Sequence, residues 1–87
     1  MQWYVYVLRS IPTGRHYIGM SSDVERRLQE HNTKTGRWTS SFKPWELIAL
    51  EEFGSRSEAG NRERFLKSRA GLAERLGLYG QLGGAKR

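Results

Sequence analysis

Cysteine is absent from this 87-residue chain, which excludes disulfides, thiolate zinc sites and cysteine nucleophiles together. Any metal must therefore be bound through oxygen or nitrogen. Long apolar runs are lacking too, because the N-terminal apolar stretch is far shorter than the roughly 20 residues that a membrane-spanning helix requires, and no basic leader precedes it. We therefore expect a soluble cytoplasmic protein without a membrane partner.

The length predicts one domain, since a chain of this size buries only about 60% of its unfolded surface. Three Trp, four Tyr and three Phe supply bulky core side chains. We place this domain at residues 1–79 and expect the glycine-rich, basic residues 80–87 to be a disordered tail. The net charge of +6 makes nucleic acid the leading partner class, although a basic surface also serves solubility alone.

The first half of the chain predicts a hairpin followed by a helix. Residues 3–9 and 16–20 are rich in aromatic and branched side chains, and a Pro and a Gly lie between them at turn spacing. Ser22 and Glu25 form a capping-box pattern that predicts a helix over residues 23–32. In that helix Arg27 and His31 lie one i, i+4 step apart.

The second half predicts a polar, basic surface loop over residues 33–44, a strand over 45–53 and a helix over 57–67. A short last helix is expected over residues 73–78. Trp38 and Trp45 near the basic loop could stack on a nucleobase or close a dimer, and packing in the core or at its rim is the simpler interpretation of both.

Three polar residues occupy elements that otherwise need apolar side chains: Tyr6 and Tyr17 on the two hairpin strands, and Glu63 on the face of Ala59 and Leu66. Each has a structural explanation, because strand tyrosines are usually half-buried core residues and Glu63 could pair with a lysine one helical turn on. Arg27 and His31, taken alone, fit a solvated helix face.

Together these residues match the needs of phosphodiester hydrolysis, which requires a cation on the phosphoryl oxygens, a base near water and a positive side chain. Glu63 is a hard oxygen ligand suited to Mg²⁺ or Mn²⁺. Free phenol has a pKa of about 10, so a tyrosine base would need a metal and an arginine to lower it. Arg27 would hold a phosphate oxygen, and His31 would hold or pass a proton.

The spacing of Tyr4-Val5-Tyr6 and Tyr17-Ile18-Gly19 resembles the paired motifs of the GIY-YIG nuclease superfamily, with Tyr4 and Val5 standing where the first motif has Gly and Ile. Residues 22–32 resemble its first helix and residues 61–67 its glutamate helix. The chain looks most like the small stand-alone endonuclease-type members related to the N-terminal cleavage domain of the UvrC repair nuclease. The resemblance implies an α+β fold, a three-stranded antiparallel sheet flanked by helices.

The resemblance also implies a metal-dependent DNA endonuclease, structure-directed and linked to DNA repair or processing. Its roles would be metal ligation by Glu63, phosphate contact by Arg27, base or water-orienting work by Tyr6 or Tyr17, and support from His31. The alternative is a non-catalytic nucleic-acid-binding module that keeps the site's shape, and a plain basic scaffold is the third possibility. We expect no small-molecule cofactor, and a homo-oligomer or a partner protein could supply targeting.

Phosphate contacts are expected from Arg37, Lys43, Arg62, Arg64 and Lys67.

Overall fold

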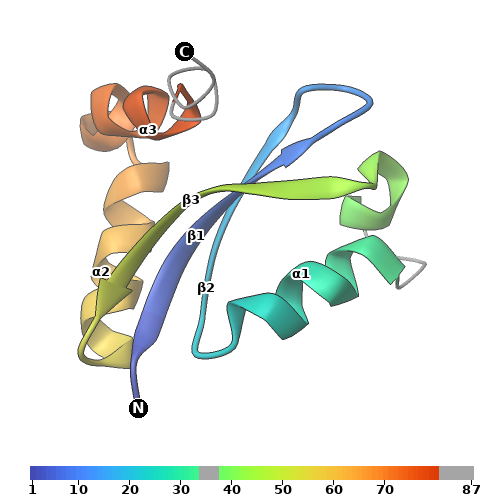
Figure 1. Cartoon of the computed structure of the whole chain (residues 1–87). Coiled ribbons are helices and arrows are strands. Elements are labelled where there is room, and N and C mark those ends of the chain that lie inside the picture. Colours follow the sequence, from blue (N-terminus) through green and yellow to red (C-terminus); the bar gives the residue numbers. More distant parts are fainter. Residues whose placement is uncertain (34–37, 81–87) are drawn as a thin grey trace.

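The computed structural model describes residues 1–33 and 38–80, and over these residues the chain folds around a single antiparallel sheet (Figure 1). Strand β1 lies in the middle, in the order β2-β1-β3. The elements in chain order are β1 (Trp3–Ser10), β2 (His16–Ser21), α1 (Val24–Thr33), the 3₁₀ helix η1 (Trp38–Phe42), β3 (Trp45–Phe53), α2 (Arg56–Lys67), the 3₁₀ helix η2 (Arg69–Gly71) and α3 (Leu72–Tyr79). The expected α+β fold is confirmed.

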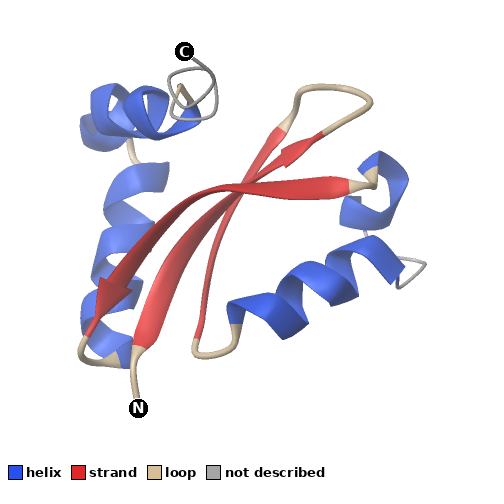
Figure 2. Cartoon of the chain, in the orientation of Figure 1, coloured by secondary structure: helices blue, strands red, loops and turns tan. Residues whose placement is uncertain are grey.

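Helices cover both faces of the sheet, as Figure 2 shows, and β1 is therefore buried on both sides. Val5 and Val7 point to the α2 side, where their cluster includes Ala59 and Leu66 of that helix. Tyr6 and Leu8 point to the α1 side, where Trp45, Tyr17, Val24, Leu28 and Phe42 pack around them. The alternation of β1 therefore assigns Tyr6 to the α1 face of the sheet and leaves α2 on the opposite face.

Helix α1 begins one residue later than predicted, and its cap is a different side chain. The Asp23 carboxylate accepts the backbone N–H of Arg26 at 3.1 Å, while Ser21 Oγ accepts the N–H of Asp23 at 2.9 Å. The capping box expected from Ser22 and Glu25 is thus replaced by an Asp23 cap. Aspartate caps a helix as well as serine does, so its position one residue further along decides where the helix begins.

The expectation of a plain loop before β3 is wrong for residues 38–42, which form η1. The hydroxyl of Ser10 donates to Phe42 O at 2.6 Å, and the indole N–H of Trp45 donates to Thr39 O at 2.7 Å. These side-chain bonds satisfy two backbone carbonyls of a polar segment that shows no helical periodicity. Residues 34–37 and most of the basic tail expected at 80–87 lie outside the described residues.

Helix α3 is tied to the rest of the fold by two arginines. Arg62 of α2 donates to Glu51 of β3 at 2.8 and 3.0 Å and to Glu74 of α3 at 2.7 Å. Arg75 donates to Leu66 O at 2.6 Å and so satisfies a carbonyl near the end of α2. These bonds fix α3 against the end of α2. Within residues 1–33 and 38–80, no helix has the length and apolar character to cross a membrane.

Candidate active site

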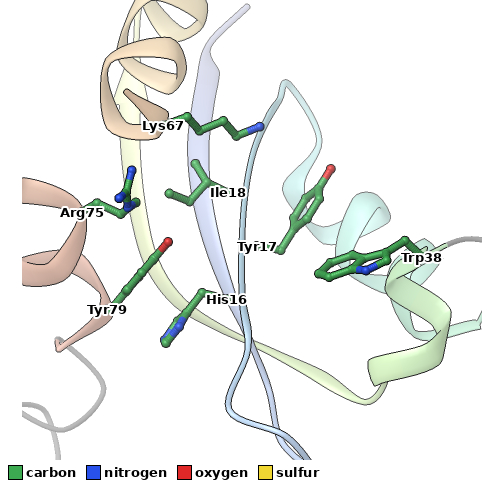
Figure 3. A pocket seen from close by; sticks show the side chains of 7 residues that line it. All are labelled: His16, Tyr17, Ile18, Trp38, Lys67, Arg75 and Tyr79. Carbon is green, nitrogen blue, oxygen red and sulfur yellow. The ribbon is translucent and has the colours of Figure 1, made fainter. Parts of the chain in front are cut away.

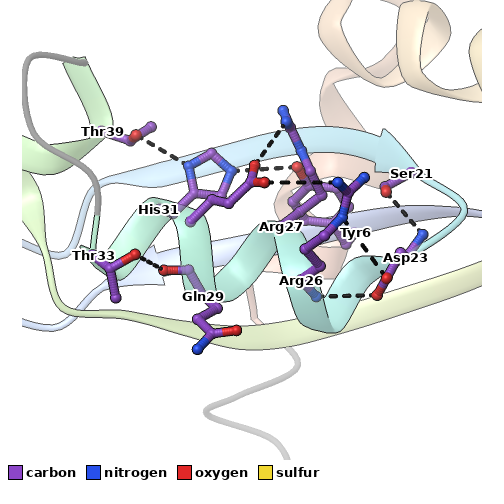
Figure 4. Close-up of polar contacts among 10 residues, drawn as sticks. Tyr6, Ser21, Asp23, Arg26, Arg27, Gln29, His31, Thr33 and Thr39 are labelled. Carbon is purple, nitrogen blue, oxygen red and sulfur yellow. Dashed lines mark hydrogen bonds and ion pairs between the residues drawn. The ribbon is translucent and has the colours of Figure 1, made fainter.

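A buried polar chain joins β1 to α1 and η1 (Figure 4). The Tyr6 hydroxyl lies 3.3 Å from Nε2 of His31, and Nδ1 of the same ring lies 3.0 Å from the Thr39 hydroxyl. Tyr17 of β2 packs edge-on against His31, with ring centroids 4.7 Å apart, and lies 6.2 Å from the Tyr6 ring. The structure therefore brings three of the predicted site residues, Tyr6, Tyr17 and His31, into one cluster.

Gly19 makes room for this cluster. It pairs with Tyr6 across the β1–β2 ladder. A Cβ at Gly19 would lie 2.6 Å from the Tyr6 hydroxyl oxygen, 2.8 Å from its Cζ and 3.0 Å from Cε2 of Tyr17. Two of these separations are below the range that real Cβ atoms adopt, so the glycine of the Tyr17-Ile18-Gly19 motif has a direct steric reason: it lets the Tyr6 ring lie flat over the strand.

Burial decides the protonation state of Tyr6. Its side chain is completely buried, and this burial raises the pKa of the hydroxyl above its ordinary value, an effect that the nearby Arg27 guanidinium opposes without overcoming. The surrounding residues therefore do not lower the pKa of Tyr6, although action as a base would require a lowered pKa. A neutral Tyr6 can donate its O–H to Nε2 of His31, and the imidazole then donates from Nδ1 to Thr39.

Arg27 lies at the rim of the cluster with its side chain about a third exposed. Its guanidinium forms an ion pair with Glu30 at 3.2 Å, which positions it on the side of α1 that faces the tyrosines (Figure 4). Its pKa is raised, first by the Tyr6 hydroxyl and further by Glu30 and Tyr17. Arg27 therefore faces both phenols while remaining open to solvent.

Glu63 lies on α2, on the opposite face of the sheet, and is linked to the cluster through Lys67. The Lys67 ammonium lies 3.0 Å from Oε2 of Glu63 and 6.0 Å from the centroid of the Tyr17 ring. The charge of Glu63 also acts on the pKa of Tyr6. Figure 3 shows Lys67 extending past β2 toward Tyr17. Side chains from both faces thus meet at the open edge of β2, and the Glu63–Lys67 pair considered from the sequence is present as well.

Metal binding at this edge would depend on few protein ligands. Within the part of the chain that the structure describes, no group of three or more His, Asp or Glu side chains could hold a metal ion. Glu63 offers one hard carboxylate, with its side chain 22% exposed. Mg²⁺ commonly takes one or two carboxylates and retains several waters, so this donor fits such an ion when Lys67 gives up its contact.

The residues expected to contact phosphate are not equivalent. Arg64 is exposed and bonds to Asn61, whereas the Arg62 guanidinium is already engaged by Glu51 and Glu74. Lys67 is engaged by Glu63. Lys43 is half-buried before β3, and Arg37 lies outside the described residues. The contacts of Arg62 therefore favour a structural role, and Arg64 has the more available charge.

Several residues around the site carry no signal in the sequence that would predict their place. Thr39 falls in the segment interpreted as a loop, and only the fold brings its hydroxyl to His31. His16, Arg75 and Tyr79 surround a shallow hollow of about 280 Å³ next to Tyr17 and Lys67. A pairing between residue 16 and residue 79 has no local sequence signature, because it depends on where α3 packs.

The comparisons with known proteins agree with this geometry. Residues 2–75 match the GIY-YIG catalytic domain family. The chain therefore belongs to the GIY-YIG nuclease superfamily, and the resemblance seen in its motifs is confirmed. Nucleases with this domain generally use a divalent metal and act on DNA.

Within that superfamily the chain is similar to small proteins named UPF0213. It is 37% identical to UPF0213 protein DP2720 of Desulfotalea psychrophila, over 75% of this chain and 60% of that protein. With UPF0213 protein Reut_B5558 of Cupriavidus pinatubonensis it shares 34% identity over 93% of this chain and 89% of the relative. The solution NMR structure of the UPF0213 protein BH0048 from Bacillus halodurans is 31% identical, with a TM-score of 0.52, over 90% of this chain and 85% of that one.

Proposed function

We propose that the protein is a metal-dependent endonuclease that hydrolyses DNA phosphodiester bonds. The observation that carries this proposal is that Tyr17 of β2 lies within the influence of Arg27 on one face of the sheet and 6.0 Å from Lys67, the ion-pair partner of Glu63, on the other. A phosphate at this edge could be approached by a phenol, a guanidinium and a carboxylate together. These are the groups that phosphodiester hydrolysis requires.

Tyr17 and Tyr6 have different tasks in this proposal. Tyr17 is half-buried and borders the hollow, so its hydroxyl can hold the attacking water, whereas Tyr6 has no exposed surface. Tyr6 acts through His31, and Thr39 fixes the other nitrogen of that ring. We therefore assign water binding to Tyr17 and positioning to Tyr6, His31 and Thr39.

Glu63 would hold Mg²⁺ or Mn²⁺, and such an ion supplies charge neutralisation at the phosphoryl oxygens. Arg27 donates hydrogen bonds to a non-bridging phosphate oxygen, which its exposed rim position allows. Lys67 leaves Glu63 and remains near enough to neutralise a neighbouring phosphate. Hydrolysis breaks one P–O ester bond, and water supplies the oxygen to phosphorus and a proton to the leaving oxygen.

Substrate choice is proposed to depend on DNA shape more than on base sequence. All the described elements pack around one sheet, so base reading by a separate helix is not built into this part of the chain. Nicked, flapped or branched DNA would then be the substrate, in a cytoplasmic role in DNA repair or processing. A second copy or a partner protein would supply any further targeting.

The test is a cleavage panel of linear, nicked, flapped and branched DNA with Mg²⁺ or Mn²⁺. The wild-type protein is expected to cut at least one structured substrate, and Glu63→Ala is expected to cut none of them. Glu52→Ala is the control, because it removes one carboxylate from an exposed position on β3. Equal cutting by wild type and Glu63→Ala would overturn the assignment of the metal ligand.

The Glu63–Lys67 ion pair favours one alternative, a nucleic-acid-binding module without turnover. In that case Lys67 would keep its contact with Glu63 at 3.0 Å and the metal would find no ligand. The protein would bind DNA with strong salt dependence yet cleave none of the panel. Lys67→Ala separates the two functions, since freeing Glu63 should increase metal affinity only if a metal site exists.

A further inference from the structure

Two hollows lie along β2, and the first of them includes the candidate active-site residue Tyr17. The first involves His16, Tyr17 and Ile18 at the start of β2, and the second involves Met20 near its end. Helix α2 contributes Lys67 to the first and Gly60 and Arg64 to the second. A nucleic-acid strand that runs along this edge would therefore meet both hollows, and Tyr17 would border it in the first.

The first hollow, of about 280 Å³, is lined mainly by aromatic rings (Figure 3). His16 and Tyr79 stack face to face, with centroids 3.8 Å apart and planes 9° from parallel. Across β2 lie Tyr17 and Trp38, and Trp38 is 53% exposed. Trp45, the other tryptophan near this segment, is by contrast buried and bonded to Thr39. Core packing therefore accounts for Trp45 and leaves much of the Trp38 ring open to a ligand.

Two cations border the same hollow. Arg75 is fixed by its bond to Leu66 O at 2.6 Å, and the Lys67 side chain is 51% exposed. Aromatic faces combined with a positive border are the features by which proteins bind unpaired nucleotides, since the rings stack on the base and the cations approach its phosphate.

The second hollow, of about 490 Å³, differs in chemistry. It is lined by Met20, Ser57 and Gly60 together with the guanidinium-bearing Arg56 and Arg64, and no aromatic ring borders it. Arginines in a hollow without an aromatic lining suit backbone phosphates and carry no preference for an unpaired base. The two hollows along β2 therefore suit different parts of a nucleotide.

We propose that the hollow formed by His16, Trp38, Lys67, Arg75 and Tyr79 binds an unpaired nucleobase of the substrate strand, next to the scissile phosphate, while Arg56 and Arg64 hold backbone phosphates on the other side. This inference rests on the proposed nuclease function and refines its substrate: DNA in which at least one nucleotide beside the cleavage point is unpaired. Paired bases are stacked within a duplex and cannot enter the hollow.

The test measures binding of the full chain to fluorescent DNA in EDTA, so that cleavage does not interfere. The probe is a duplex with a single-stranded thymidine overhang, compared with the same duplex carrying abasic residues in the overhang. Wild type is expected to prefer the thymidine probe by roughly 5- to 100-fold, the range that base–aromatic stacking supplies. Tyr79→Leu should lose most of this preference and Tyr79→Phe should keep it.

Two further variants make the result decisive. Trp38→Leu changes an exposed ring and should reduce the preference even if Tyr79→Leu fails to fold, which circular dichroism would show. Arg64→Ala should weaken binding of both probes equally and leave their ratio unchanged. Equal affinity of wild type for the two probes overturns the proposal, as does an unchanged preference in folded Tyr79→Leu and Trp38→Leu.

Two mixed outcomes separate base binding by the hollow from nuclease activity. Cleavage that depends on Glu63, without any preference for the thymidine overhang, would reject the base-binding hollow and keep the nuclease. A clear preference without cleavage under Mg²⁺ or Mn²⁺ would keep the hollow and reject the nuclease.

Discussion

Replacing Gly19 with alanine tests the packing of the candidate site more severely than removing any of its polar groups. The new Cβ would lie 2.6 Å from the Tyr6 hydroxyl oxygen and 2.8 Å from Tyr6 Cζ. Tyr6 is completely buried, so its ring can move only by displacing His31 or the strand beneath it. Overpacking of a buried site typically costs about 1–3 kcal/mol, and we expect Gly19→Ala to be destabilised within that range.

The matched control is Gly60→Ala, in the interior of α2. A Cβ at Gly60 would meet only Arg64 Nη1 and Met20 Sδ, both at 3.6 Å, which is ordinary contact. Since glycine within a helix costs about 0.5–1 kcal/mol relative to alanine, this variant should be stabilised. The same chemical change is therefore predicted to act with opposite sign at the two positions.

Urea denaturation of both variants measures the difference, and thermal unfolding should show a shift of about 4–8 °C for each kcal/mol. Adding Tyr6→Phe to Gly19→Ala removes the nearest clashing atom and should recover only part of the loss, because Cζ remains 2.8 Å away. Wild-type stability in Gly19→Ala would show that the Tyr6 ring has room to move, contrary to this prediction. Equal destabilisation by the two single alanine substitutions would contradict it too.

Three other variants test separate contacts. Arg62→Ala should lower stability by roughly 1 kcal/mol because it removes the ion-pair partner of Glu51. Arg64→Ala should leave stability nearly unchanged. It should instead reduce the salt dependence of DNA binding, as titration at several salt concentrations would show. Burial, and secondarily a neighbouring arginine, lowers the pKa of His16 below its ordinary 6.5. Because the unfolded chain then binds more protons, the free energy of unfolding should fall as the pH drops below about 6.5. The fall should be less steep in His16→Gln. The pKa of Tyr6 is raised, so stability should fall above about pH 10, where the unfolded phenol ionises first, and Tyr6→Phe should weaken that alkaline loss in urea titrations.

Most of the fold could be predicted from the sequence because its signals are local. The aromatic and branched residues of β1 and β2, with Gly14 at a φ of 80° between them, specify a hairpin without any long-range information. The helix boundary at Asp23 was missed by one residue because Ser22 and Asp23 are both good caps. The helix η1 was missed because its order depends on side-chain hydrogen bonds from Ser10, which is distant in the chain, and from Trp45 of the next strand.

The candidate site could be predicted only where a motif or a helical step marked it. The Arg27 and His31 spacing places both side chains on one side of α1, and the structure shows them beside Tyr6. The sequence predicts that an arginine helps to lower a tyrosine pKa. Burial, which is a tertiary property, has the larger effect at Tyr6 and raises its pKa. The contact between His16 and Tyr79 also depends on tertiary packing.

Residues from both faces of the sheet are proposed to form one catalytic unit at the edge of β2. Single-turnover cleavage of the preferred DNA substrate by Tyr17→Phe, Glu63→Gln and the double variant shows whether they do. Each single variant should lose about 100-fold or more in rate, and the double variant should be no slower than the slower single one, because groups that act as a unit are not additive. A wild-type rate in either single variant, or losses that multiply in the double variant, would show that Tyr17 and Glu63 do not act as one catalytic unit.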